Sequence, residues 1–205
     1  AEDIWAMTFH AACCRILRRY IDRCGYTSSF TIYDASDSER LMKEILRDQG
    51  LDDKTYPPRY VLSVIGRQKD RLISPEEMEE DSRSASDYRI VQIARVYGIY
   101  QKRLKDNNAL DFDDILYVTV KLLQQDQEVR EYYQRKFHYV LVDEYQDTNH
   151  VQYLLTALLA GSRRNICVVG DDDQSIYRFR GATIENILSF EEQYPGARVI
   201  RLEQN

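Results

Sequence analysis

Two carboxylates, Asp143 and Glu144, are the residues of this sequence best placed to do chemistry. They directly follow residues 140–142, a Val-Leu-Val run of the kind that forms a strand buried on both faces of a sheet. In open α/β sheets, ligands bind at the carboxyl ends of the strands. Asp143 would hold a hydrated Mg²⁺ there, and Glu144 would face a nucleophilic water, as in a Walker B site.

A second segment, residues 165–182, repeats this pattern. Its strand, residues 166–169, ends at Gly170 and three aspartates, and Gln146 and Asp147 extend the first group of polar side chains. The alternative is that the acids only cap a helix that begins near Thr148, since acidic side chains are frequent at helix N-termini. The run of residues 140–144 alone leaves both interpretations open.

The complete amino-acid sequences of the two segments resemble those of a known family. DEYQDTN, GDDDQSIYRFRGA and LEQN, preceded in order by TFHAACCRIL, PPRY and NALDFDDIL, are similar to the superfamily 1A DNA helicases of the UvrD, Rep and PcrA type. The resemblance covers essentially all 205 residues. It implies a motor that uses Mg²⁺ and ATP to move 3′ to 5′ on single-stranded DNA and to act at junctions of single and double strands.

The resemblance assigns roles on the ATP side to three residues. Asp143 would anchor Mg²⁺, Glu144 would be the general base, and Gln174 would lie near the γ-phosphate. These side chains are therefore the predicted catalytic and ATP-binding residues.

The resemblance also predicts DNA contacts. Thr8 and His10 lie in the TFH segment beside the single-strand path, and Phe112 would stack on a base, which gives affinity without base preference. Phe179 stands where the family usually has Trp, so we expect weaker stacking there. The loop that carries Gln174 supplies three further predicted contacts: Tyr177, Phe179 and Arg180.

The predicted fold class is α/β, with a partial RecA-like P-loop NTPase sheet and an all-helical inserted subdomain. Residues 1–33 and 110–205 would form motor domain 1A, and residues 34–109 the inserted domain 1B. In domain 1A we expect strands at 4–9, 140–142, 166–169 and 198–203, and helices at 11–24, 126–136, from 148 to Gly161, and 183–193. In domain 1B we expect helices ending at 48, 72 and 104, with a short acidic helix from Pro75.

The sequence contains no P-loop motif, because none of its eight glycines is followed by Lys. We therefore expect an internal fragment of a helicase, whose partners include the missing P-loop segment and the second motor domain, 2A. Phosphoryl transfer needs the P-loop lysine and an arginine finger as well as a base. The chain by itself is expected not to hydrolyse ATP.

Composition sets outer limits. The chain is 43% hydrophobic and 30% charged, with a net charge of -6, and no apolar run reaches the ~18 residues of a membrane span, so a cytoplasmic location is expected. The four cysteines lack CxxC spacing and are expected to be reduced core residues. Four arginines share one face of the first helix, either as a DNA-phosphate stripe or as a solvated face: Arg15, Arg18, Arg19 and Arg23.

Two rival functions remain open. A Mg²⁺-dependent nuclease would also cluster carboxylates at strand ends, and it would reveal itself by nicking plasmid DNA. A non-catalytic nucleic-acid or protein-binding module is the other alternative. A version that bound only proteins would show no affinity for single-stranded DNA.

Overall fold

The computed structural model describes residues 4–84, 87–171 and 190–200, and the chain divides into two compact units, Ala1–Glu131 and Tyr132–Asn205. Within the described residues, each unit combines helices with one two-stranded parallel sheet. The predicted mixed α/β class is therefore confirmed.

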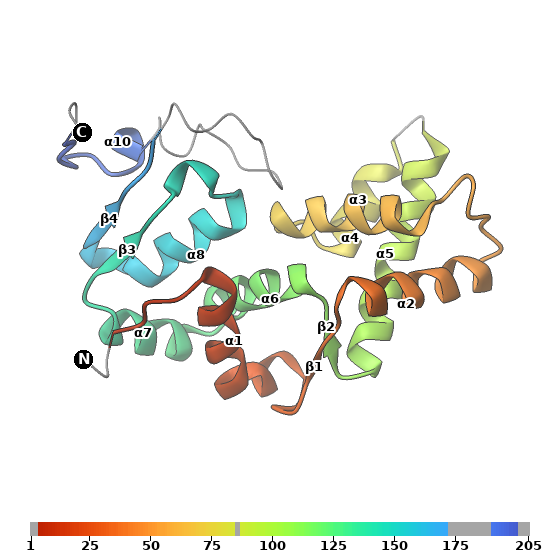
Figure 1. Cartoon of the computed structure of the whole chain (residues 1–205), viewed down its shortest axis with the longest axis horizontal. Coiled ribbons are helices and arrows are strands. Elements are labelled where there is room, and N and C mark those ends of the chain that lie inside the picture. The colour runs from red at the N-terminus through yellow and green to blue at the C-terminus, as the bar shows by residue number, and fades with distance from the viewer. Residues whose placement is uncertain (1–3, 85–86, 172–189, 201–205) are drawn as a thin grey trace. The chain divides into compact units, whose positions relative to one another are not determined.

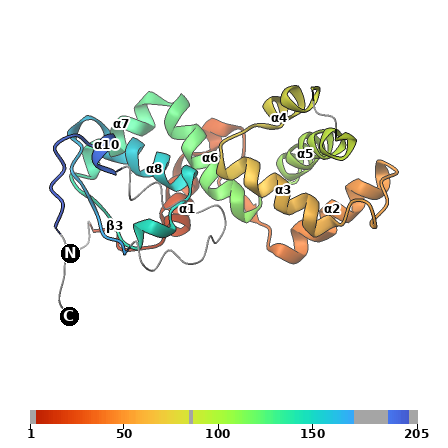
Figure 2. The same cartoon turned by 90° about the horizontal axis from the view of Figure 1, so that it is seen from above.

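In the first unit, a short parallel pair of strands flanks a run of helices (Figure 1), and Figure 2 shows these helices from above. Strand β1 (Thr31–Ile32) pairs with β2 (Ala109–Leu110), with Thr31 opposite Ala109. The helices between them pack around a continuous apolar core that includes Met42, Val61 and Tyr97. These helices are α2 (Ala35–Asp48), α3 (Pro58–Asp70), α4 (Pro75–Ser82) and α5 (Tyr88–Asp106).

Local capping explains where these helices begin. Asp34 caps α2 by accepting a bond from the backbone N–H of Asp37 (2.8 Å), and the Asp37 side chain accepts from Asp34 in return. Helix α2 therefore begins at Ala35, directly after its cap. Ser74 forms the same reciprocal box at α4, and Pro58 occupies the first turn of α3, where its missing N–H costs nothing.

Helix α1 (Phe9–Tyr20) continues into η1 (Ile21–Cys24) and packs on α6 (Phe112–Gln125). Three of its arginines are used inside the unit. Arg18 donates to the carbonyls of Ser28 and Phe30, both at 2.8 Å; Arg23 pairs with Asp126 and Glu128; and Arg15 lies over the Trp5 ring. All four arginines of this face are nevertheless exposed, so the solvated face and the DNA-phosphate stripe both stay open.

In the second unit, β3 (Val140–Val142) pairs in parallel with β4 (Ile166–Val168), with Val140 opposite Ile166. Helix α8 (His150–Ala160) packs against β3 and ends at Gly161, as expected. Both central strands were predicted correctly. The remaining elements are α7 (Gln127–Lys136), which enters this unit, η2 (Tyr145–Asp147), η3 (Gly161–Arg163) and α10 (Phe190–Gln193).

Two expected strands are wrong where the structure describes them. Residues 4–7 form no strand, because the Thr8 hydroxyl accepts a bond from the Ala11 N–H (3.3 Å) and starts α1 at Phe9. Residues 198–200 also have no strand partner, while residues 201–203 lie outside the described part. Only residues 190–193 of the expected helix at 183–193 are described, and they are helical.

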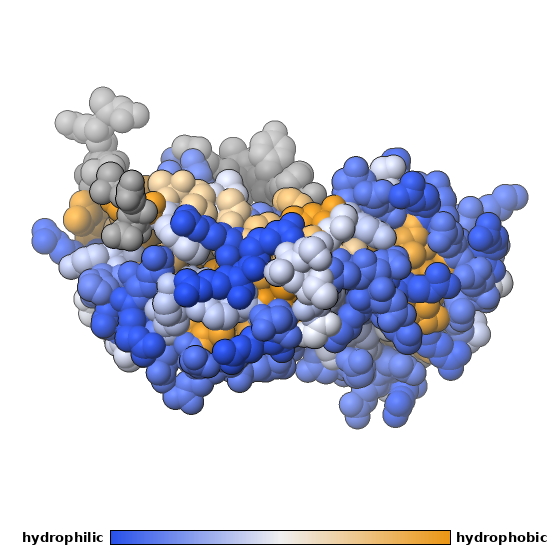
Figure 3. Space-filling view, turned by 90° about the horizontal axis from the view of Figure 1, so that it is seen from below, coloured by the Kyte–Doolittle hydropathy of each residue, from blue (hydrophilic) through white to orange (hydrophobic). Residues whose placement is uncertain are grey.

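The face shown in Figure 3 is mostly hydrophilic, with apolar side chains visible in small areas. None of the helices in the described ranges is both long enough and apolar enough to cross a membrane. The four cysteines are free, as expected, and Cys13 is fully buried, which raises the pKa of its thiol to about 12. Cys167 is exposed, so the expectation that all four lie in the core is wrong.

A buried cation links α3 to the start of α6. Lys69 is 1% exposed, and its Nζ lies 2.7 Å from Asp111 Oδ2 and 2.8 Å from Asp114 Oδ1. Burial opposes the charge on Lys69, but the two carboxylates outweigh it and raise the lysine pKa. Asp111 and Asp114 also form the capping box of α6, so one cluster fixes both the helix start and its contact with α3.

Replacing Lys69 with Met should destabilise the first unit by about 3–5 kcal/mol, because two carboxylates would remain buried without their cation. Urea unfolding followed by the fluorescence of Trp5, the single tryptophan of the chain, measures this loss. Lys102→Met breaks the exposed pair with Asp106 and serves as the control. Equal midpoints for the two variants would show that the buried cluster does not stabilise the unit.

Asp114 should make stability depend on pH between 7 and 5. Burial, followed by the charge of Asp111, raises the pKa of Asp114 from 3.8 to about 6. The folded state therefore binds more protons than the unfolded state in this window, and this group's contribution to stability rises as the pH falls towards 5. The pKa of Asp111 is lowered, because Lys69 outweighs its burial, so its contribution stays constant in this window.

In Asp114→Asn, the increase in the urea midpoint between pH 7 and pH 5 should be smaller than in the unmodified chain. The two proteins differ at this one position, so the difference reports on Asp114. An identical pH dependence would contradict a raised pKa at this carboxyl.

Candidate functional site

The carboxyl ends of β3 and β4 lie together, because the two strands are parallel and in register. Hydrogen bonds continue the pairing past the strands: the Val169 N–H donates to the Val142 carbonyl (2.8 Å), and the Tyr145 N–H donates to the Val169 carbonyl (2.9 Å). Asp143 and Glu144 lie at this edge, and both side chains are exposed. Among the described residues, the polar groups that directly follow β3 and β4 thus lie at one edge of this sheet.

Glu144 has an unusual backbone, with φ 51° and ψ 43° in the left-handed region. Such a conformation costs a residue with a side chain ~1 kcal/mol or more, and it is typical of functional sites. Its N–H donates to Asp143 Oδ1 at 3.0 Å, which helps to hold the turn. The bend takes the chain from β3 into η2 and leaves both carboxylates at the sheet edge.

Gln146 connects the two strand ends. Its side-chain Nε2 donates to Glu144 Oε2 at 2.6 Å, and its Oε1 accepts from the Asp171 N–H at 3.1 Å. Sequence reasoning placed Gln146 in the site but missed these contacts. The signal available in the sequence was a single polar residue two positions after Glu144, and it did not indicate a partner after β4.

The capping alternative for Asp143 and Glu144 is wrong. Helix α8 is capped by Asn149, whose Oδ1 accepts from the Gln152 N–H at 3.0 Å, while Gln152 Oε1 accepts from the Asn149 N–H at 3.0 Å. Glu144 precedes η2 but makes no side-chain capping bond to it. The helix-capping task therefore falls to other residues and does not account for the acidic pair.

Asp143 has the chemistry to hold Mg²⁺. This ion keeps several water ligands and is usually bound through one or two carboxylates together with substrate phosphates. Asp143 supplies one exposed carboxylate, and Glu144 stands next to it. In the described ranges, no three His, Cys, Asp or Glu side chains come together as a metal-binding group.

Four predicted site residues, Gln174, Tyr177, Phe179 and Arg180, lie outside the described residues. The positions expected for them near the γ-phosphate and the DNA therefore stay predictions.

In the first unit, the structure brings together two predicted DNA contacts. The rings of His10 and Phe112 are stacked, with centroids 3.8 Å apart and an angle of 17° between the planes. Phe112 is 45% exposed, so its ring is not part of the core. Thr8 is exposed as well, and it caps α1 beside His10.

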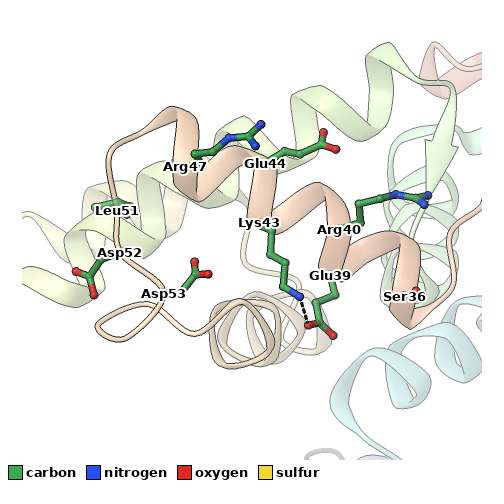
Figure 4. Close-up of a pocket in the computed structure, with 9 residues that line it drawn as sticks. All are labelled: Ser36, Glu39, Arg40, Lys43, Glu44, Arg47, Leu51, Asp52 and Asp53. Atoms are coloured by element: carbon green, nitrogen blue, oxygen red, sulfur yellow. Dashed lines mark ion pairs between the residues drawn. The ribbon is translucent and has the colours of Figure 1, made fainter.

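A hollow of about 670 Å³ lies along α2, and its lining carries both positive and negative side chains. Its three basic residues, Arg40, Lys43 and Arg47, stand among acidic ones, and Glu39 pairs with Lys43 at 2.9 Å (Figure 4). Arg59 also binds Glu39, at 2.8 Å. The mixture does not produce the basic surface that a nucleic acid or a polyphosphate would need.

Comparisons with known proteins identify the family of this chain. A model of the UvrD/REP helicase N-terminal domain matches residues 1–195. The chain is 52% identical over all 205 residues to the ATP-dependent DNA helicase PcrA of Bacillus subtilis, and 49% identical to those of Staphylococcus aureus and Staphylococcus epidermidis. It spans 27–28% of the length of these relatives. The chain therefore belongs to the UvrD/REP helicase N-terminal domain family.

Proposed function

We propose that this chain is part of an ATP-dependent DNA helicase that moves 3′ to 5′ along single-stranded DNA and acts at its junctions with duplex. The family match over residues 1–195 is the observation that carries the proposal. The relatives, which are named ATP-dependent DNA helicase PcrA, are about four times as long as this chain. The activity thus belongs to a longer protein that also supplies a P-loop and a second motor domain.

On the ATP side, Asp143 would hold Mg²⁺, which would supply positive charge to the phosphates, and Glu144 accepts a proton from the attacking water. The left-handed turn at Glu144 and its contact with Gln146 support this assignment, because they fix a carboxylate at the sheet edge where ligands of α/β proteins bind. Gln174 acts near the γ-phosphate.

On the DNA side, a base stacks on the exposed part of Phe112. The His10 ring, parallel to Phe112 at 3.8 Å, holds the phenyl ring in a defined orientation and so lowers the entropy lost when a base binds. Thr8 lies next to this pair, at the positive end of α1, where a phosphate is stabilised. Tyr177, Phe179 and Arg180 provide further contacts from the loop after β4.

The proposed architecture is a partial RecA-like sheet in domain 1A and the helical insertion 1B at residues 34–109. The β1 and β2 pair supports these limits, because it joins residues 31–32 to residues 109–110 at the two ends of the helical run. The apolar core shared by α2, α3, α4 and α5 supports a lobe that folds around its own interior. The cytoplasmic location stays a prediction.

In the full-length protein, Glu144→Gln should keep Mg-ATP binding and lower DNA-stimulated turnover by ~10²-fold or more, because the general base is lost. Asp143→Asn should instead raise the Mg²⁺ concentration needed for half-maximal turnover. Phosphate release at varied Mg²⁺, with nucleotide binding measured separately, tests both. Near-normal turnover in Glu144→Gln would remove Glu144 from the mechanism, and Mg²⁺-dependent nicking of plasmid DNA would favour the nuclease.

Phe112→Ala in the full-length protein should weaken oligo-dT binding by ~5- to 150-fold, since one base stack contributes ~1–3 kcal/mol. Fluorescence anisotropy with labelled oligo-dT measures the change. Tyr88→Ala is the matched control, because Tyr88 is an aromatic residue of the same unit with 69% exposure and no proposed DNA role. Unchanged affinity in Phe112→Ala would contradict the stacking site, and an unmodified protein without DNA affinity would favour a protein-binding module.

A further inference from the structure

We propose that Gln146 is a positioning residue for Glu144, and that it makes the placement of this carboxylate depend on the backbone after β4. The inference rests on the proposed role of Glu144 as the general base. It assigns the orientation of the Glu144 carboxylate to a residue that does not itself need to contact ATP.

The side-chain amide of Gln146 is buried and is not directed to solvent. The residue is 1% exposed, and its two polar atoms are both used, at 2.6 Å to Glu144 Oε2 and at 3.1 Å to the Asp171 N. The Asp171 N–H only donates, whereas an ionised carboxylate only accepts. These partners fix which end of the amide faces which strand, so the side chain has one satisfied orientation.

Glu144 needs such a partner because its own side chain is exposed. A free glutamate samples several rotamers, and a general base works only when its oxygen lies within hydrogen-bond reach of the water it activates. The Gln146 N–H occupies Oε2, which leaves the other carboxylate oxygen for that water. Because the donor is neutral, it orients the carboxylate without placing a full positive charge beside it.

The second bond of Gln146 links this geometry to the other strand. Asp171 follows Gly170 and begins the segment that continues to Gln174 in the sequence. A shift of the backbone at Asp171 would break or lengthen the bond to Gln146 Oε1, and the amide could then turn away from Glu144. The side chain of Gln146 thus links the Glu144 carboxylate to the end of β4. The segment that follows β4 carries the residues predicted to contact nucleotide and DNA.

The test uses the full-length protein with Gln146→Glu, which has nearly the same shape. The new carboxylate can still accept from the Asp171 N–H, but it cannot donate to Glu144, so the base loses the bond that orients it. We expect kcat at pH 7 to fall by ~10²-fold, with KM for Mg-ATP changed less than ~3-fold. Gln152→Glu makes the same substitution at the α8 capping box, where Glu also suits the position, and should change none of these values.

A double-mutant cycle separates positioning from simple loss of structure. In a Glu144→Gln background, Gln146→Met should cause little further loss of turnover, because its effect passes through Glu144. Multiplicative losses would overturn the inference, as would a kcat of Gln146→Glu equal to that of Gln152→Glu. Gln146→Met also replaces Gln146→Glu if the charged variant fails to fold.

The two proposals fail differently. If the unmodified protein hydrolyses ATP and Glu144→Gln does not, while the Gln146 variants behave normally, the positioning role is wrong and the proposed function stands. If Glu144→Gln retains near-normal turnover, the proposed role of Glu144 is wrong, and the positioning role falls with it.

Discussion

The buried contact of Lys69 with Asp111 and Asp114 is the constraint on which the first unit depends. A charged group in an apolar interior is costly unless it is paired and hydrogen-bonded, so the three side chains must remain together. Lys69 lies on α3, whereas the two aspartates cap α6. The contact therefore determines where α6 begins, and it holds that helix start against the core of α2, α3, α4 and α5.

The Lys69 contact also affects the proposed DNA site, because it fixes the start of α6, where Phe112 lies. Phe112 follows Asp111 directly and is the first residue of α6, and its ring stacks on His10 at the start of α1. A residue on α3 thus helps to place an aromatic ring at the surface. Such support is what a rigid stacking surface requires, since a ring that must be ordered on binding loses affinity.

The second unit uses a different device, backbone geometry at the end of a sheet. Parallel pairing of β3 and β4 brings their carboxyl ends together, and the left-handed turn at Glu144 holds an exposed carboxylate there. The turn is unfavourable for Glu by local preference alone. The bonds from the Glu144 N–H to Asp143 and from Gln146 to the Glu144 carboxylate offset that cost.

The sequence was informative wherever the signal was local. The capping pair Asp111 and Asp114, Pro58 in the first turn of α3, and the apolar runs of β3 and β4 all follow from neighbouring residues. The Lys69 contact spans 42 positions, and nothing near that lysine marks it as buried. The two-residue strands β1 and β2 are too short for a periodic pattern, and at residues 4–9 the cap at Thr8 outweighed strand-forming composition.

A structure of the full-length protein with Mg²⁺, a non-hydrolysable ATP analogue and oligo-dT tests the central claim most directly. The account predicts Mg²⁺ bound by Asp143, the Glu144 carboxylate facing the γ-phosphate side while Gln146 still binds it, and a DNA base stacked on Phe112. A nucleotide bound away from Asp143 and Glu144, with the acidic pair facing solvent, would contradict the account.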